Sequence, residues 1–154
     1  MSRPLNPASL PAISKALKLY KVSSFITGGF LLLLMATWAL RRLEVVTNGA
    51  TVGYDLWAFG PNGLVSLEPY LNEGAGLPET GLNLTVAILV LHGWLYVLYL
   101  FADFRMWTLM RWSFLRFLII ASGGIVPFLS FYTENRYAKI AETEMRAAGW
   151  AGKN

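Results

Sequence analysis

The sequence predicts an all-α integral membrane protein with three transmembrane helices, a long outer loop and an interfacial C-terminal helix. Of its 154 residues, 55% are hydrophobic and only 14% are charged, a composition typical of membrane-embedded chains rather than soluble domains. Three apolar runs cover residues 22–40, 82–102 and 113–132. Each run has the roughly 20 residues that a helix needs to cross a hydrocarbon core of about 30 Å. We therefore expect a single membrane domain over residues 1–154.

Residue counts and spacings exclude several classes of site. The chain has no cysteine and one histidine, which excludes disulfides, iron–sulfur clusters, covalent c-type haem and bis-histidine haem within the chain. The sequence also lacks paired catalytic carboxylates, a nucleophile–histidine pair, a zinc-ligand spacing and a glycine-rich phosphate loop. We expect a protein that is not an enzyme and has no cofactor of its own. Haem or quinone would be met only through partner subunits.

The net charge of +4 is spread along the chain, because the Lys and Arg residues flank the apolar runs instead of forming one basic stripe. This placement predicts contacts with phospholipid headgroups and an influence on membrane topology. It does not favour nucleic-acid binding.

Residues 1–21 are a cytoplasmic lead-in to the first span. Three lysines recur along one helical flank of this segment: Lys15, Lys18 and Lys21. The segment is either a short basic helix at the membrane surface or a solvated turn. In the first span, residues 22–40, Gly28 and Gly29 allow another helix to approach closely, which favours helix packing in lipid.

Residues 41–81 form a long loop that we place outside the membrane. After Arg41 and Arg42 the loop contains five acidic residues and no further Lys or Arg. Its aromatic residues, prolines and glycines indicate a compact segment that rests on a membrane interface or on a partner protein. Trp57 and Tyr70 are the candidates for partner contact.

The second span, residues 82–102, contains His92, the only histidine. A neutral imidazole in lipid can exchange hydrogen bonds with Ser122, Thr85 or a free carbonyl group of a neighbouring helix, which makes His92 a helix–helix tether. The alternative is a proton-relay or quinone contact, but the spans provide no second proton station. Gly93 favours the tether, because a small residue lets another helix come close.

A cytoplasmic loop, residues 103–112, leads to the third span, residues 113–132. This span contains three residues that predict close helix packing and a kink: Gly123, Gly124 and Pro127. Backbone groups freed by the kink must find partners within the helix bundle.

Two acidic residues stand beside arginines near the ends of the spans. Asp103 precedes Arg105 by two positions, and Glu134 precedes Arg136 in the same way. We interpret both as solvated ion pairs at the level of the lipid headgroups.

The tail, residues 133–154, mixes apolar and charged residues with a helical period. It is either an amphipathic helix at the membrane interface or a continuation of the third span. Trp150 is its candidate for partner contact.

The distribution of basic residues sets the predicted orientation. Four basic residues precede the first span, and three more surround the connection between the second and third spans. Both segments are therefore placed on the cytoplasmic side of a bacterial plasma membrane. The tail then lies outside, although its own four basic residues nearly balance the two sides.

Two stretches of the chain carry a family resemblance. The sequence HGWLYVLYL at residues 92–100 and the sequence SGGIVPF at residues 122–128, followed by Glu134, resemble a family of small three-span integral membrane proteins of actinobacteria with no assigned function. The resemblance covers roughly residues 17–136. Family members usually have Glu-Gly near the start of the first span, where this chain has Thr27 before its glycine, so the resemblance gives less support to proton handling.

We therefore expect a non-catalytic accessory subunit that packs on other integral membrane subunits of a larger complex. The actinobacterial resemblance makes the respiratory supercomplex of cytochrome bc complex and cytochrome oxidase the first partner to test. One alternative is a small oligomeric transporter or channel with His92 lining its path. The other is a transient assembly factor for a membrane complex.

Overall fold

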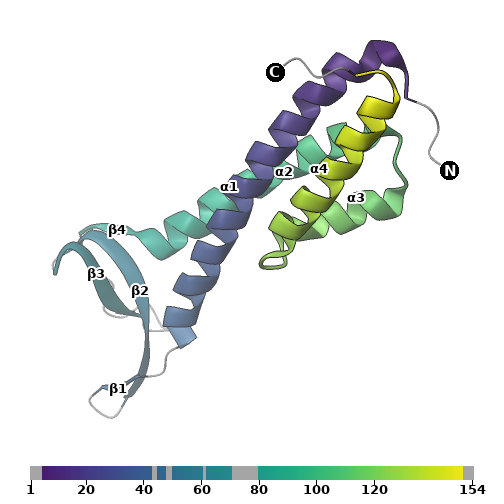
Figure 1. Ribbon diagram of the computed structural model, residues 1–154. Coiled ribbons are helices and arrows are strands. Elements are labelled where there is room, and N and C mark those ends of the chain that lie inside the picture. The colour runs from purple at the N-terminus through teal and green to yellow at the C-terminus, as the bar shows by residue number, and fades with distance from the viewer. Residues whose placement is uncertain (1–4, 43–44, 48–49, 61, 71–79, 151–154) are drawn as a thin grey trace. The chain divides into compact units, whose positions relative to one another are not determined.

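A computed structural model describes residues 5–42, 45–47, 50–60, 62–70 and 80–150 of the chain. Figure 1 shows the elements, which follow one another in this order: the 3-10 helix η1 (Pro7–Ser9), α1 (Leu10–Arg42), β1 (Val45–Thr47), β2 (Ala50–Gly60), β3 (Gly63–Tyr70), β4 (Leu82–Asn83), α2 (Leu84–Met110), α3 (Phe114–Ala121), the 3-10 helix η2 (Ser122–Gly124) and α4 (Leu129–Ala147).

The chain divides into two compact units. Unit 1 consists of Met1–Leu31 and Trp94–Asn154, and unit 2 consists of Leu32–Gly93. The two long helices contribute to both units, because α1 begins in unit 1 and ends in unit 2, whereas α2 runs from unit 2 into unit 1.

Unit 1 is a helical bundle with one hydrophobic core. The α4 helix returns beside the first half of α1 (Figure 1). Its apolar side chains enter the core together with residues of α1 and α2, among them Ile13, Tyr20, Tyr99, Met106, Tyr137, Ala141 and Met145. The apolar face that the sequence predicts for the tail is therefore buried within unit 1.

Small hydroxyl side chains link the helices of unit 1. Ser24 Oγ in α1 donates a hydrogen bond to the carbonyl oxygen of Ser130 in α4 at 3.2 Å. Thr27 Oγ1 donates to the carbonyl oxygen of Leu95 in α2 at 3.1 Å. All of these helix contacts rely on small or hydroxyl-bearing residues, which are the residues that favour close helix association in lipid.

The predicted third span, residues 113–132, is not one continuous helix. The α3 helix ends at Ala121, and α4 begins at Leu129 after Phe128, whose φ of 64° is left-handed. With eight residues, α3 is about 12 Å long, too short to cross a bilayer. The chain reverses direction here (Figure 1), at the residues for which the sequence predicts a kink: Gly123, Gly124 and Pro127. A third transmembrane helix is therefore not confirmed.

The α1 and α2 helices are long and apolar enough to cross a membrane. In their most apolar stretches only 33% and 22% of the residues, respectively, are buried within the protein. Core helices of soluble proteins bury their apolar faces, whereas these two present apolar side chains outward. This exposure supports membrane insertion of the two helices. They contain the predicted spans at residues 22–40 and 82–102, except that the second span starts with the two residues of β4.

Unit 2 contains an antiparallel sheet where the sequence analysis expected a loop. Strand β2 pairs with β3 from Gly53↔Tyr70 to Gly60↔Gly63, and it also pairs with β1 and β4. The all-α prediction was therefore incomplete. Part of the signal was present, because residues 51–59 are rich in β-branched and aromatic residues and are followed by a turn sequence, Gly-Pro-Asn-Gly.

Candidate functional site

The described residues contain no group of three or more His, Cys, Asp or Glu side chains that could hold a metal ion. Their buried polar side chains form two sites instead, one in each unit. Unit 2 has an ion pair next to an apolar groove, and unit 1 has polar groups inside its helical bundle.

An arginine–aspartate pair joins three elements of unit 2. Arg41, near the end of α1, donates from Nε and Nη2 to the two carboxylate oxygens of Asp55 in β2, at 2.5 and 2.9 Å. Asp55 Oδ2 also accepts a hydrogen bond from Asn83 Nδ2 in β4 at 2.7 Å. Asp55 is only 2% exposed, and the Tyr70 ring stacks on the guanidinium group at 4.4 Å. A bidentate pair of this kind fixes the geometry of both partners.

Two further hydrogen bonds extend this network to the start of α2. Asn83 Oδ1 accepts from the backbone N–H of Val86 at 3.0 Å and so caps the helix. Thr85 Oγ1 accepts from the backbone N–H of Leu56 in β2 at 3.0 Å. We call the set Arg41, Asp55, Asn83 and Thr85 the polar junction. It ties the end of α1, strand β2 and the start of α2 together.

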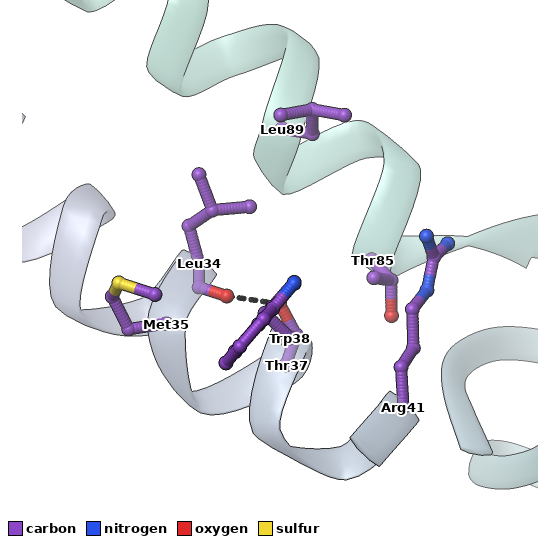
Figure 2. Close-up of a pocket in the computed structure, with 7 residues that line it drawn as sticks. All are labelled: Leu34, Met35, Thr37, Trp38, Arg41, Thr85 and Leu89. Carbon is purple, nitrogen blue, oxygen red and sulfur yellow. Dashed lines mark hydrogen bonds between the residues drawn. The ribbon is translucent and has the colours of Figure 1, made fainter. Parts of the chain in front are cut away.

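An apolar groove of about 180 Å³ lies next to the polar junction, between α1 and α2. Figure 2 shows its seven lining residues: Leu34, Met35, Thr37, Trp38, Arg41, Thr85 and Leu89. The hydroxyl group of Thr37 donates to the carbonyl oxygen of Leu34 at 3.0 Å, so the groove presents mainly carbon. Trp38 and Leu89 are 51% and 52% exposed, which leaves the groove open at the surface of the unit.

Unit 1 buries a carboxyl group that the sequence analysis placed at the membrane surface. Asp103 is 0% exposed, and neither of its oxygens accepts a hydrogen bond from the described residues. Arg105 is exposed, and no ion pair joins it to Asp103 in the part of the chain that the structure describes. The predicted Asp103–Arg105 pair is therefore wrong. The predicted Glu134–Arg136 pair is wrong too, because Arg136 donates to the hydroxyl oxygen of Tyr132.

Two tyrosines of α2 bond to the carbonyl groups that the helix break leaves free. Tyr99 Oη donates to the carbonyl oxygen of Ile120 at 2.6 Å, and Tyr96 Oη donates to that of Ala121 at 3.3 Å. The last carbonyl groups of a helix lack partners within it, and a buried carbonyl left without one is costly. The sequence predicts His92 as a candidate donor to a carbonyl group freed near Pro127, and that role stays a prediction.

Ion pairs and hydrogen bonds bring the charged ends of unit 1 together. Lys21 Nζ in α1 lies 2.6 Å from Glu142 Oε1 in α4. Glu144 in α4 accepts a hydrogen bond from Trp112 Nε1 at 3.2 Å and lies 3.8 Å from the guanidinium group of Arg116. The lead-in, the connection between α2 and α3, and the tail therefore meet at one end of unit 1.

The predicted packing glycines differ in what surrounds them. A Cβ atom added at Gly28 would overlap Ser130 Oγ, one at Gly124 would overlap the Tyr96 ring, and one at Gly123 would lie 3.0 Å from the Ser130 backbone. By contrast, a Cβ atom at Gly29 or at Gly93 would have no described heavy atom within 4 Å. His92 and Pro127 are both half-buried.

The three aromatic residues predicted to contact a partner lie against their own units. Trp57 is buried in β2 with 7% exposure, and Tyr70 stacks on Arg41. Trp150 packs against the core of unit 1, and its backbone N–H donates to the carbonyl oxygen of Met145 at 3.0 Å.

The burial of Asp55 and Asp103, the two most deeply buried carboxyl groups among the described residues, was not predicted from the sequence. A detectable signal existed for Asp55. Asp55 lies two residues before Trp57, a spacing that places both side chains on one face of a strand. Asp103 lies four residues after Tyr99 and three before Met106, a spacing that places all three on one helical face.

A comparison with protein families gives a match over most of the chain. The model of a family described as a domain of unknown function (DUF3817) matches residues 17–139, nearly the range over which the sequence shows its resemblance. Comparisons with curated proteins and with solved structures found no match.

Proposed function

The chain belongs to the DUF3817 family, and we propose that it is a non-catalytic accessory subunit of a larger complex in a bacterial plasma membrane. In this role α1 and α2 insert into the bilayer, and helices of partner subunits pack on their exposed faces. Any haem or quinone belongs to those partners.

The observation that carries this proposal is the contrast between filled and open glycines in the apolar helices. Gly28 and Gly124 are packed against Ser130 and Tyr96 of the same chain, whereas Gly29 and Gly93 face open space. Glycine within a helix costs about 1 kcal/mol relative to alanine. In lipid this cost is offset when another helix packs closely on the glycine. A partner helix at Gly93 supplies the contact that the described part of the chain does not.

The surroundings of Gly93 fit such a contact. Trp94 is 72% exposed, the largest exposed fraction among the large hydrophobic side chains, and Val90 and Val97 are exposed on the same side of α2. A large aromatic side chain beside a glycine forms a ridge next to a groove. A second helix can pack its own ridge into such a groove. Tryptophan is also enriched among the residues that dominate the energy of protein interfaces.

The first partner under this proposal is the respiratory supercomplex of cytochrome bc complex and cytochrome oxidase. The resemblance of residues 92–100 and 122–128 to a small actinobacterial membrane family supports this choice. The outer segment of unit 2 and the tail provide extramembrane surface for contact with such a complex.

The test is affinity purification of the tagged full-length chain from its native membrane in mild detergent, followed by mass spectrometry. The wild-type chain is expected to bring down cytochrome subunits in stoichiometric amounts. Gly93→Leu is expected to lose them, because its side chain occupies the contact. Leu91→Phe is the matched control, since Leu91 is 50% exposed on the opposite side of α2. Recovery of the wild-type chain alone contradicts the proposal, and recovery only with immature complexes favours an assembly factor.

A revised topology accompanies this function: both ends of the chain lie in the cytoplasm. The contact of Lys21 with Glu142 supports it, because it joins the lead-in to the tail. Basic residues support it as well. Eleven of the 13 Lys and Arg residues lie in the lead-in, in or beside the connection between α2 and α3, and in the tail, and only Arg41 and Arg42 lie elsewhere. The tail then adds to the cytoplasmic charge instead of balancing it.

In this topology α3 and η2 enter the membrane from the cytoplasmic side, and α4 leads the chain back to the cytoplasmic side. Three side chains of α3 are apolar and strongly exposed, which suits contact with lipid: Phe114, Leu115 and Leu118. A re-entrant segment is tolerated in a bilayer only when its non-helical backbone is satisfied by the protein. The bonds from Tyr96 and Tyr99 to the end of α3 meet this requirement.

Cysteine labelling tests this topology directly, because the chain has no native cysteine. Single variants Asn62→Cys, Ser113→Cys and Thr143→Cys place thiols at exposed positions in unit 2, before α3 and on α4. A membrane-impermeant maleimide should label the Asn62→Cys variant in intact cells and the other two only after lysis. Labelling of the Thr143→Cys variant in intact cells would restore the outer position of the tail.

A further inference from the structure

We propose that the groove between α1 and α2 in unit 2 binds an acyl chain of an anionic phospholipid, whose phosphate group is held by Arg42. This lipid site depends on membrane insertion of the two helices and not on the accessory-subunit role. It can therefore be tested independently of the partner complex.

The size and lining of the groove determine the class of occupant. A dry cavity of about 150 Å³ lined by apolar side chains binds a molecule as large as benzene, and this groove measures about 180 Å³. Leu34, Met35 and Leu89 supply carbon surface, and the Thr37 hydroxyl is bonded to its own helix. Such a lining has little to offer water or a polar ligand but suits a short stretch of hydrocarbon chain.

The position of the groove along the two helices matches the edge of the hydrocarbon layer. Arg41 and Arg42 directly follow the apolar run of residues 22–40, and Thr85 lies at the start of α2. Trp38 forms part of the wall, and tryptophan is enriched where hydrocarbon meets headgroups. An acyl chain in the groove would therefore have its headgroup beside the two arginines.

The two arginines at the groove differ in whether a carboxylate pairs with them. The guanidinium group of Arg41 is engaged by both carboxylate oxygens of Asp55. Arg42 is exposed, its guanidinium carbon lies 5.2 Å from the centre of the Trp38 ring, and no described carboxylate pairs with it. Because Trp38 also lines the groove, the charge of Arg42 stands next to the opening. Guanidinium groups bind phosphate through paired hydrogen bonds, so charge complementarity favours an anionic phospholipid over a partner's apolar side chain.

Native mass spectrometry of the delipidated full-length protein, titrated with defined lipids, tests the site. Wild-type protein is expected to bind one phosphatidylglycerol about tenfold more tightly than phosphatidylcholine, because both lipids carry the phosphate but the choline ammonium group of the latter repels the guanidinium group of Arg42. Arg42→Gln should abolish this preference, whereas Arg105→Gln, at an exposed arginine of unit 1, should leave it unchanged. Glycerol 3-phosphate, which has the phosphate but no acyl chain, should not bind.

Filling the groove tests the acyl-chain part of the site. Leu89→Trp is expected to weaken the first binding event for both lipids by about tenfold or more, and Leu91→Trp, equally exposed on another side of α2, should not. Leu34→Phe narrows the groove from α1 and serves as a second filled variant if Leu89→Trp lowers the melting temperature. Equal affinities for the Leu89→Trp and Leu91→Trp proteins, or an unchanged lipid preference in Arg42→Gln, would overturn the proposal. Tight binding of a protein partner that Leu89→Trp blocks without a change in lipid binding would assign the groove to that partner.

Discussion

The two units of this chain differ in charge and in how they use polar groups. Unit 1 contains 11 Lys and Arg and four Asp and Glu residues, for a net charge of +7, whereas unit 2 contains two and five, for −3. Unit 1 keeps its ion pairs at the surface and buries mainly hydroxyl groups and one carboxyl group. Unit 2 instead buries the carboxylate of a bidentate ion pair at the junction of a helix and a sheet.

This difference shows two ways of holding long apolar helices in place. In unit 1 the helices meet through glycine, serine and threonine, so van der Waals contact and short hydrogen bonds stabilise the bundle. In unit 2 the ends of α1 and α2 are connected to a sheet by the polar junction.

The largest expected effect comes from breaking the polar junction of unit 2. Asp55→Ala leaves Arg41 and Asn83 without their shared acceptor, and breaking a buried ion pair in this way costs about 3 kcal/mol, the lower end of the usual range, because Arg41 is partly exposed. Thermal unfolding in detergent and hydrogen exchange of β2 measure the loss. Asp55→Asn keeps one acceptor oxygen and should lose less. A loss below about 1 kcal/mol for Asp55→Ala would show that the sheet does not depend on the junction.

Gly124 in unit 1 and Gly93 in unit 2 should respond to alanine with opposite signs. Gly124→Ala in unit 1 forces its methyl group into the Tyr96 ring and should destabilise the protein by about 2 kcal/mol. Gly93→Ala in unit 2 meets open space and should stabilise the free chain by about 0.5 to 1 kcal/mol, because alanine is the better helix former. Melting curves of the purified chain measure both. Equal effects would mean that packing does not distinguish these positions.

Removing the tyrosine hydroxyl groups that bond to the end of α3 should destabilise unit 1 by a smaller amount. Tyr99→Phe leaves the Ile120 carbonyl group without its 2.6 Å donor, which should cost about 1 to 1.5 kcal/mol. Tyr96→Phe removes a longer, less buried bond and serves as the graded control. Urea titration followed by tryptophan fluorescence compares the two. A larger effect of Tyr96→Phe would contradict the assigned roles.

The smallest expected effect is at the buried carboxyl group of unit 1. Because Asp103 accepts no hydrogen bond from the described residues, Asp103→Leu removes a desolvated polar group without breaking a bond and should stabilise the free chain by up to about 1 kcal/mol. Asp103→Asn should be nearly neutral. Thermal unfolding in detergent measures both changes. Destabilisation by Asp103→Leu would reveal a bonding role for this carboxyl group.

The elements were predictable to very different degrees. The tail's charged and apolar residues alternate with a helical period, and its apolar residues Tyr137, Ala141 and Met145 are buried as that pattern predicts. The apolar residues of α1 and α2 are instead distributed all around each helix, so no period distinguishes the buried face from the exposed one. For this reason the inward position of Asp103 could not be read from apolarity alone, and the Asp103–Arg105 pair was predicted incorrectly.

The sheet of unit 2 was missed for a different reason. Its aromatic and glycine-rich sequence fits both a compact loop and a hairpin, and the length of the connection favoured neither. The strand pattern and the turn residues are compatible with β2 and β3, but the bond from Arg41 to Asp55 joins a helix end to a strand 14 residues away. Such a contact depends on the paired register of the strands, which becomes definite only in the folded chain.

By itself, the sequence determined a mostly helical chain, long apolar helices over two of its three predicted spans, a kink near Pro127, no cysteine chemistry and basic residues beside its apolar runs. These properties follow from local composition and spacing. The tertiary structure decided that α4 returns to the lead-in, that Gly28 is filled while Gly93 is open, and that Asp103 is buried. Each of these depends on which helix faces lie against each other, and in uniformly apolar helices that choice is made by packing between segments far apart in the chain.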